Sequence, residues 1–178
     1  MLEYGVLDTK PVEIRFGILT VSDSGHRGER PRDESGEAIR SCLQRLNARE
    51  ERYAVVPDEK DAISGKLREW AGLGLDLVLT TGGTGLSPRD VTPEATMAVL
   101  DRLAPGFSEV MRAESQKKTP RAMLSRGVSG ACGRCLIINL PGSPKAVKES
   151  LEVILGTLPH AVDVLRGQVR ECASEAPG

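Results

Sequence analysis

Aromatic residues are scarce in this chain of 178 residues, which has one Trp, two Tyr and two Phe. A charge excess of either sign is also missing, because 24 basic residues face 25 acidic ones. Such a composition gives no indication of nucleic-acid binding. No apolar run approaches the roughly 20 residues that span a membrane, and the mixed, charged N-terminus does not resemble a signal peptide. We therefore expect a cytoplasmic protein with no nucleic-acid partner and no membrane partner.

Cysteine is rare as well. The four residues, Cys42, Cys132, Cys135 and Cys172, are too few for a fold held by disulfides. Cys132 and Cys135 form a CxxC pattern, but a structural zinc site needs two more ligands, and there is no second CxxC or clustered His pair. A redox CxxC opens a helix, whereas this one leads into an apolar run. The pattern therefore favours coincidence over a metal or redox role.

What the chain does have is a regular alternation of short apolar runs and helical stripes. Continuous apolar runs are typical of strands buried in parallel sheets, and intervening apolar residues at helical spacing indicate crossover helices. This alternation predicts an α/β fold with three layers, a doubly wound and mainly parallel sheet with helices on both faces. We expect one domain over residues 14–167, an N-terminal extension over 1–13 and a polar tail over 168–178.

The same patterns place the individual elements. Strands are predicted over 14–21, 53–56, 75–79 and 135–140, with residues 26–32 as a loop after the first strand. Helices are predicted from Asp33 through the stripe of Ile39, Leu43 and Leu46, from 63 to 72, over 93–103 with Met97 and Leu100 inward, from 107 to about 118, over 147–155, and over 158–165, with a turn or short helix at 120–126.

The most specific stretch is TTGGTGLSPRDVTPEA, residues 80–95, which follows an apolar run and precedes a helix. Gly82, Gly83 and Gly85 let the backbone turn tightly, and their N–H groups, with the neighbouring Thr hydroxyls, are suitable partners for an anionic group. Thr92 reads as the helix N-cap, followed by Pro93. The plainer alternative is a glycine-rich connection without a ligand. Loops of this length are usually functional, so the stretch favours a polyanion site.

Polar segments follow four of the predicted strands. They begin at Ser22, Pro57, Gly82 and Asn139. Because the carboxyl ends of parallel strands lie at one edge of a sheet, where open α/β sheets bind ligands, the four segments are expected to form one site.

Seven motifs, in order along the chain, carry a family resemblance. The chain resembles the MogA/MoaB family of molybdopterin adenylyltransferases and is similar to the adenylyltransferase domain of gephyrin and its plant counterpart. The motifs are TVSDS (20–24), DESG (33–36), VPDE (56–59), TTGGTGLSPRDVTPEAT (80–96), PGF (105–107), AMLSR (122–126) and NLPGSP (139–144).

The resemblance implies a reaction and a set of residues. Molybdopterin and ATP would be the substrates, AMP would pass to the molybdopterin phosphate, and Mg²⁺ would be held by two carboxylates. Asp58 and Asp90 are then expected to be both catalytic and metal-binding. The substrate-binding residues implied are Ser22, Asp23, Asp33, Ser35, Gly36, Gly82, Gly83, Thr84, Gly85, Arg89, Ser125, Arg126, Asn139, Pro141, Gly142 and Ser143.

Simpler roles stay open for several of these residues. Asp58 can cap the turn after Pro57, and Asp90 can cap a helix or pair with Arg89. Asp33 or Ser35 can be an N-cap. Ser125 and Arg126 can be a solvent-facing pair in a loop.

The resemblance also implies a homotrimer and contact with a molybdenum insertase. Two other functions remain. A non-catalytic molybdopterin-binding or carrier paralogue is expected to lack one of the two aspartates, and both are present. An unrelated nucleotide-binding enzyme such as a dehydrogenase would be expected to carry the G-x-G-x-x-G fingerprint, which is missing.

Overall fold

A computed structural model describes residues 13–168. The expected N-terminal extension and polar tail lie outside the described residues except for positions 13 and 168, and Cys172 lies outside them as well. Within this range the strands form one six-stranded sheet in the order β2-β1-β3-β6-β5-β4. β1 (Ile14–Val21), β2 (Ala48–Val56), β3 (Leu77–Thr81) and β6 (Cys135–Leu140) are parallel, while β5 (Ser129–Cys132) and β4 (Arg102–Leu103) are antiparallel.

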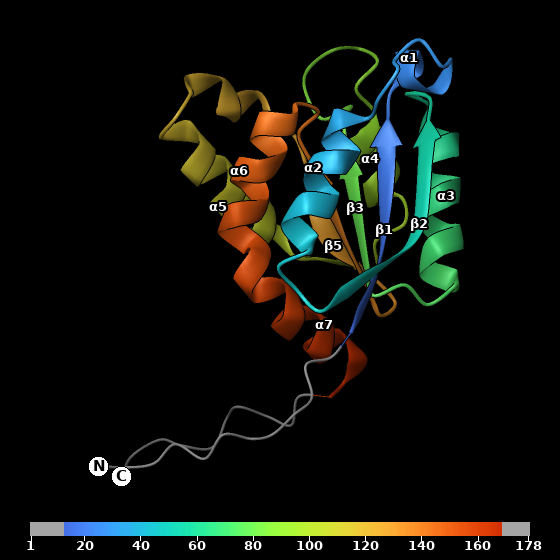
Figure 1. The fold of residues 1–178 in the computed structure, drawn as a ribbon, viewed down its shortest axis with the longest axis vertical. Coiled ribbons are helices and arrows are strands. Elements are labelled where there is room, and N and C mark those ends of the chain that lie inside the picture. The colour runs from blue at the N-terminus through green and yellow to red at the C-terminus, as the bar shows by residue number, and fades with distance from the viewer. Residues whose placement is uncertain (1–12, 169–178) are drawn as a thin grey trace.

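Helices cover both faces of this sheet, which confirms the predicted three-layer α/β fold (Figure 1). One core cluster packs α2 (Glu34–Leu43), α5 (Pro105–Gln116), α6 (Pro144–Ile154) and α7 (Leu158–Arg166) on one face, and a second packs α3 (Lys60–Gly72) and α4 (Thr92–Met97) on the other. Neighbouring residues of β1 point to opposite faces, so Ile18 lies in the first cluster and Leu19 in the second. Burial on both faces explains why β1, β3 and β6 are almost continuously apolar.

Most of the predicted helices form where their apolar stripes indicate. Asp33 is the N-cap of α2 and accepts from the main-chain N–H of Gly36 at 3.0 Å. Of the two N-cap candidates, Asp33 and Ser35, the structure therefore selects Asp33. Gly167, with φ of 71°, ends α7 in the left-handed conformation. The segment 120–126 contains a short 3₁₀ helix, η1 (Pro120–Leu124), and a second, η2 (Leu155–Thr157), joins α6 to α7.

The helix predicted over 93–103 is wrong beyond Met97. α4 ends there, and Arg102 and Leu103 form β4 because Asp101 and Ala104 donate main-chain hydrogen bonds to β5, at 2.8 and 2.9 Å. Met97, predicted to point inward, is 55% exposed. The N-cap of α4 is Val91, not Thr92, whose hydroxyl instead donates to the Gly82 carbonyl.

Two strand predictions also need correction, and one further strand was missed. β2 begins at Ala48 rather than at 53, because its first half is a charged edge strand without the apolar pattern of a buried one. β3 begins and ends two residues later than predicted, so Thr80 and Thr81 belong to the strand. β5 has only four residues and was not predicted. In addition, residues 23–26 form a single helical turn, α1 (Asp23–His26), so the predicted loop begins only after His26.

The CxxC pattern forms the hairpin turn between β5 and β6. Cys132 and Cys135 are register partners, and both are free thiols, as is Cys42. Burial raises the pKa of the Cys135 thiol to about 12, so no reactive thiolate forms there near neutral pH. Within residues 13–168, no helix is long and apolar enough to cross a membrane.

Candidate functional site at the carboxyl rim of the sheet

The carboxyl ends of the four parallel strands meet at one edge of the sheet, which we call the rim. β1 leads into α1, β2 into the turn at Asp58, β3 into residues 82–91, which we call the glycine loop, and β6 into residues 141–143. The predicted convergence of these segments is therefore present. Contacts between them hold the rim together: Thr81 donates to the Pro141 carbonyl and Ser35 to the Gly142 carbonyl, each at 2.7 Å.

The glycine loop starts in a place where only glycine fits. Gly82 has φ of 99°, and a Cβ there would overlap the carbonyl oxygen of Val21. Gly83 has φ of 62°, and its Cβ would crowd Thr92 Oγ1 and lie 3.0 Å from Asp58 Oδ1. A Cβ on Gly142 would stand 3.4 Å from Gly82 Cα. Glycine is therefore required at Gly82 and Gly83 because the protein's own atoms come close there, and main chain forms the floor of the rim.

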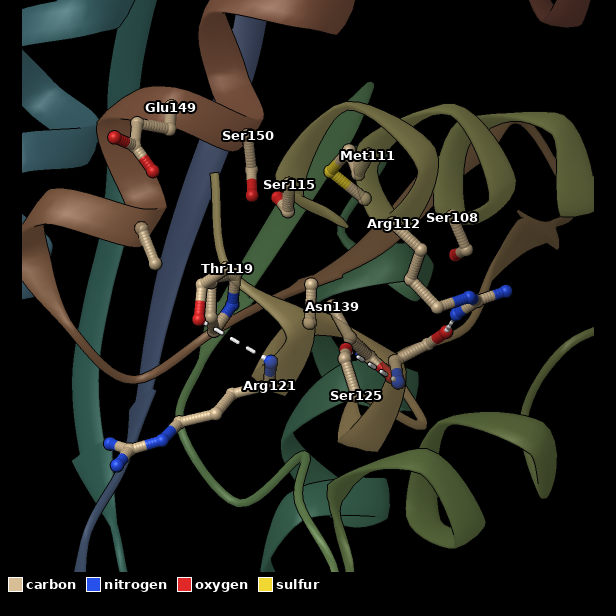
Figure 2. A pocket seen from close by; sticks show the side chains of 14 residues that line it. Ser108, Met111, Arg112, Ser115, Thr119, Arg121, Ser125, Asn139, Glu149 and Ser150 are labelled. Atoms are coloured by element: carbon tan, nitrogen blue, oxygen red, sulfur yellow. Dashed lines mark hydrogen bonds between the residues drawn. The ribbon is translucent and has the colours of Figure 1, made fainter. Parts of the chain in front are cut away.

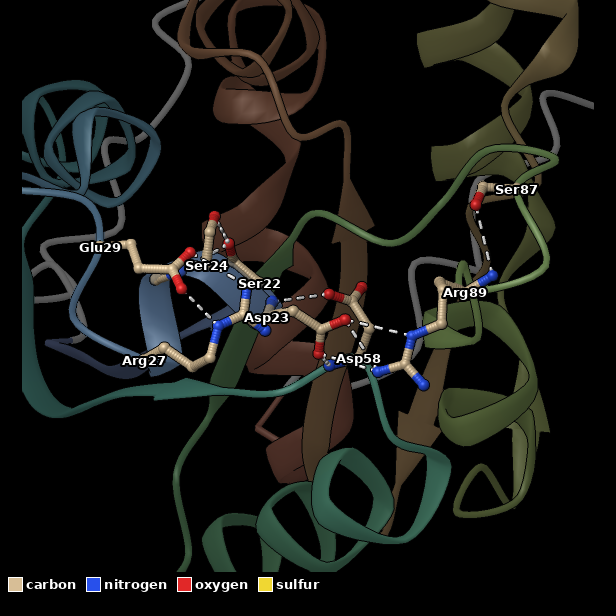
Figure 3. A network of polar contacts seen from close by, with 9 residues as sticks. Ser22, Asp23, Ser24, Arg27, Glu29, Asp58, Ser87 and Arg89 are labelled. Carbon is tan, nitrogen blue, oxygen red and sulfur yellow. Dashed lines mark hydrogen bonds and ion pairs between the residues drawn. The ribbon is translucent and has the colours of Figure 1, made fainter.

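Asp23 and Asp58 hold each other through reciprocal hydrogen bonds (Figure 3). The main-chain N–H of Asp23 donates to Asp58 Oδ2 at 2.9 Å, and that of Asp58 donates to Asp23 Oδ1 at 3.0 Å. The Arg89 guanidinium donates to both oxygens of Asp23, at 2.8 to 3.1 Å. Arg89 thus pairs with Asp23 rather than with Asp90. It ties the glycine loop to the end of β1.

These contacts give the two carboxyl groups opposite electrostatics. The hydrogen bond from the Asp58 main chain and that from Arg89 hold the pKa of Asp23 below its ordinary value. Burial is the largest influence on Asp58 and raises its pKa, whereas the hydrogen bond from the Asp23 main chain lowers it. The charge of Asp23 raises the pKa, Arg89 lowers it and Asp90 raises it by the smallest amount, so that the pKa as a whole is raised. Asp58 therefore lies in a place where a bound cation would be favourable.

Asp90 completes this acidic group. Its Oδ2 accepts from the Ser87 main chain at 3.1 Å and lies 2.8 Å from the position of a Cβ on Gly85. Among residues 13–168, no group of three or more His, Cys, Asp or Glu side chains is arranged as a metal site. Mg²⁺ is commonly held by one or two carboxylates together with substrate phosphates and waters. Asp58 and Asp90 both lie beside the glycine loop: a Cβ on Gly83 would stand 3.0 Å from Asp58 Oδ1, and one on Gly85 2.8 Å from Asp90 Oδ2.

A cavity of about 590 Å³ lies on one side of residues 141–143. Asp33 is at its edge and accepts from Gly36 and from the hydroxyls of Thr20 and Tyr53. Burial, followed by the hydrogen bond to Asp33, raises the pKa of Tyr53 to about 12, so this phenol stays a neutral donor. Predicted residues Ser22, Asp33, Ser35 and Gly142 line the cavity, together with Thr20, Arg30, Arg32 and Tyr53, which were not predicted.

A second cavity of about 220 Å³ lies on the other side, between α5, η1 and α6 (Figure 2). Its lining is mainly apolar, and hydroxyl groups, two arginines and the Glu149 carboxylate also line it. The predicted Ser125, Asn139 and Pro141 line it, and so do Ser108, Met111, Arg112, Ser115, Thr119, Arg121, Glu149 and Ser150, which were not predicted.

The Asn139 side chain binds other residues of the protein rather than facing the cavity with all of its polar atoms free. It is buried, donates to the hydroxyls of Thr80 and Thr96 at 2.9 Å each, and accepts from the Val128 main chain at 3.2 Å. Ser143 likewise caps α6 by accepting from Ala146 at 3.1 Å. Both residues shape the rim by fixing the loop after β6.

Residues 17–160 match a family model described as "Probable molybdopterin binding domain". The chain belongs to this family. The matched range contains every site residue predicted from the sequence and all four loops of the rim.

Individual relatives of this molybdopterin-binding chain agree with the family. It is 44% identical to a molybdopterin adenylyltransferase of Helicobacter pylori J99, over 86% of the chain and 89% of that protein. It is 46% identical to the Drosophila melanogaster molybdenum cofactor synthesis protein cinnamon, over 88% of the chain but only 26% of that much longer protein. The crystal structure of the molybdopterin biosynthesis enzyme MoaB from Thermus thermophilus is 55% identical, with a TM-score of 0.82, and covers 86% of this chain and 97% of that one.

Within this molybdopterin-binding domain, the sequence did not reveal the residues of α5 and η1 that line the smaller cavity. Their hydroxyls and arginines look like the solvent face of a helix and a turn. Arg121 and Thr119 lie just before the AMLSR motif, and that proximity is the one signal that could have identified them. The larger cavity had a similar signal, because Arg30 and Arg32 precede the DESG motif in a charged loop.

Proposed function

We propose that this protein is a Mg²⁺-dependent molybdopterin adenylyltransferase, which transfers AMP from ATP to the terminal phosphate of molybdopterin and releases pyrophosphate. The observation that carries the proposal is that Asp58 and Asp90 both lie beside the same glycine loop, Asp58 next to Gly83 and Asp90 next to Gly85, near two cavities of different character. The names of the full-length relatives support the same activity.

The two cavities suit the two substrates. The smaller is lined by Met111, Ala122 and Ala146 as well as by hydroxyls, which fits a flat heterocycle such as a pterin. The larger has a more polar lining, in which Arg30 and Arg32 stand beside the acidic Asp33 and Glu34. We assign the nucleotide to it because the two guanidinium groups can pair with its phosphates. Pro141 lines the first and Gly142 the second. The phosphates of both substrates would therefore meet above Gly82, between the cavities.

The chemistry needs position and charge neutralisation rather than a covalent intermediate. An oxygen of the molybdopterin phosphate attacks the α-phosphorus of ATP, the bond from this phosphorus to the bridging oxygen breaks, and pyrophosphate leaves with that electron pair. Main-chain N–H groups of the glycine loop hold the phosphates in line. Mg²⁺, when held by Asp58 and Asp90, would neutralise charge that develops on the phosphate oxygens. Asp23 orients Asp58, and Arg89 keeps Asp23 ionised.

The assay is incubation with molybdopterin, MgCl₂ and ATP labelled at the α-phosphate. Adenylylated molybdopterin is expected, and EDTA should abolish its formation. Asp90→Ala should remove turnover while pterin binding stays detectable. Arg45→Gln, which breaks an exposed ion pair with Glu152 far from the rim, is the matched control. Normal turnover by Asp90→Ala would show that this carboxylate is not catalytic.

The second candidate is a carrier that binds molybdopterin without adenylylating it. The presence of both Asp58 and Asp90 favours the enzyme. Pterin binding by the wild-type protein without any labelled product, with Mg²⁺ present, would instead identify the carrier.

Three further expectations belong to this proposal: a homotrimer, contact with a molybdenum insertase, and a cytoplasmic location. Multi-angle light scattering tests the first, and a monomer mass would remove it.

A further inference from the structure

The glycine loop is bound along its length by one side chain from a distant segment. The main-chain N–H of Arg126 donates to the Thr84 carbonyl at 2.8 Å. Its Nε donates to the Gly85 carbonyl at 2.7 Å and its Nη2 to the Asp90 carbonyl at 2.5 Å, while Nη1 forms an ion pair with Glu94. Arg126 therefore bridges the outgoing and the returning arm of the loop and the first turn of α4.

We propose that Arg126 is a positioning residue, which fixes the glycine loop and through it the Asp90 carboxylate, rather than a contact to a substrate phosphate. The consequence for turnover rests on the proposed adenylyltransferase activity. The consequence for the loop does not, and it can be measured without any substrate.

Arg126 differs in this respect from Arg89, the other arginine that holds the loop. The Arg89 side chain is 59% exposed and pairs with one carboxylate. The Arg126 side chain is 33% exposed, and each of its three guanidinium nitrogens already has an acceptor within the protein. A planar guanidinium can bind three acceptors at fixed angles, whereas a lysine ammonium cannot reproduce that arrangement.

The link from Arg126 to Asp90 is short. The Asp90 main chain donates to the Ser87 carbonyl at 2.9 Å, and the Asp90 side chain accepts from Ser87 at 3.1 Å, so the end of the loop is a compact turn. Two side chains attach this turn to the rest of the protein: Arg126 through the Asp90 carbonyl and the exposed Arg89 through Asp23. Without Arg126 only the exposed ion pair is left, so the turn can shift, and a displacement of about 1 Å at a reacting group can lower the rate about 100-fold.

The test compares Arg126→Gln and Arg126→Lys with wild type. Hydrogen exchange of the substrate-free protein, followed by mass spectrometry, should be at least about tenfold faster in peptides covering 84–91 and unchanged in the β1 and β6 peptides. In the adenylylation assay, kcat should fall about 100-fold while the KM values for ATP and molybdopterin change little. Lysine should not rescue the activity.

Arg68→Gln is the matched control, because Arg68 also donates to a main-chain carbonyl, that of Ala98, at a place away from the rim. It should leave loop exchange and kcat unchanged. If Arg126→Gln does not fold, Glu94→Gln removes one partner of the same guanidinium and should give a smaller change in the same direction.

Other results overturn the proposal. Unchanged loop exchange would show that Arg126 does not fix the loop. A rise in KM with kcat intact, together with activity restored by Arg126→Lys, would make Arg126 a phosphate contact instead. Faster exchange throughout the sheet would make it a general stabilising residue. If wild type shows no turnover, the proposed function fails, while the exchange experiment still decides whether Arg126 fixes the loop.

Discussion

Two carboxyl groups at opposite ends of the same sheet, Asp58 at the rim and Asp76 before β3, have very different surroundings. Asp76 is only 7% exposed, yet it is paired: Arg166 donates to both of its oxygens at 2.6 and 2.8 Å, and the Arg15 main chain donates at 2.8 Å. Asp58 accepts from one main-chain N–H and, within residues 13–168, has no ion pair of its own: its charged neighbours there are two further carboxylates, Asp23 and Asp90, and Arg89, whose guanidinium is bound to Asp23.

The difference shows how to separate a structural carboxylate from a functional one. A buried acid that is paired with a guanidinium and a main-chain N–H contributes to folding without any ligand. A half-buried acid among other acids is unfavourable in the free protein, and a bound cation removes that penalty. Asp58 is the second kind. The contrast predicts that changes at Asp58 affect turnover, while changes at Asp76 affect stability.

The largest effect is expected for Asp58→Asn. The amide keeps the shape of the side chain but removes a charge that would hold Mg²⁺, so adenylylation should fall about 10³-fold, equivalent to about 4 kcal/mol of transition-state free energy. Circular dichroism should show a folded protein. A variant with wild-type turnover would mean that Asp58 is not part of the reaction centre.

Asp76→Asn should give the opposite pattern. Loss of this charge leaves Arg166 without its partner, and breaking a buried ion pair typically costs about 3 kcal/mol of the free energy of unfolding. Urea denaturation measures this loss. The folded fraction should keep its kcat, and a reduced kcat at full folding would contradict the assignment of Asp76 to stability alone.

The pH dependence of stability provides a finer test. Because the folded state raises the pKa of Asp58 above its ordinary 3.8, the carboxyl group stabilises the fold while it is protonated, and that stability is lost as the pH rises through the folded pKa. Asp58→Asn has no such loss. Its melting temperature relative to wild type should therefore increase from acidic to neutral pH. A relative decrease would mean that the pKa is lowered instead.

The smallest effect is expected for Cys132→Ser in the β5–β6 hairpin, at the same end of the sheet as Asp76. If the CxxC spacing is a coincidence, the variant should keep its turnover, and its free energy of unfolding should change by less than about 1 kcal/mol. A large loss of activity, or sensitivity of the wild type to mild oxidants, would reopen a role for the CxxC pattern.

The sequence predicted the parallel half of the fold well, because β1, β3 and β6 are short apolar runs between clear helices. It did not predict β4 and β5. Those strands have two and four residues, and Ser129 and Gly130 give no apolar pattern. Main-chain pairing at the sheet edge, which sequence periodicity does not record, decides their conformation.

The candidate site was also predicted only in part: its loops were identified from the sequence, but the contacts between them were not. The motifs identified the four loops, because each loop directly follows a strand. They did not indicate that Arg89 would pair with Asp23, 66 residues away. Nor did they indicate that Arg126 would donate to main-chain carbonyls of the glycine loop, or that Asn139 would donate to two buried threonine hydroxyls. Such contacts depend on how segments that are distant in the sequence meet in space.

The place where Gly82 and Gly142 come together has a wider consequence. A surface made of peptide groups presents the same hydrogen-bonding face whatever side chains surround it, so this part of the molecule can remain constant while relatives diverge in the compounds they accept. Redesign toward another nucleotide or a differently substituted pterin should therefore change the walls, for instance at Tyr53 or Arg121, and keep both glycines.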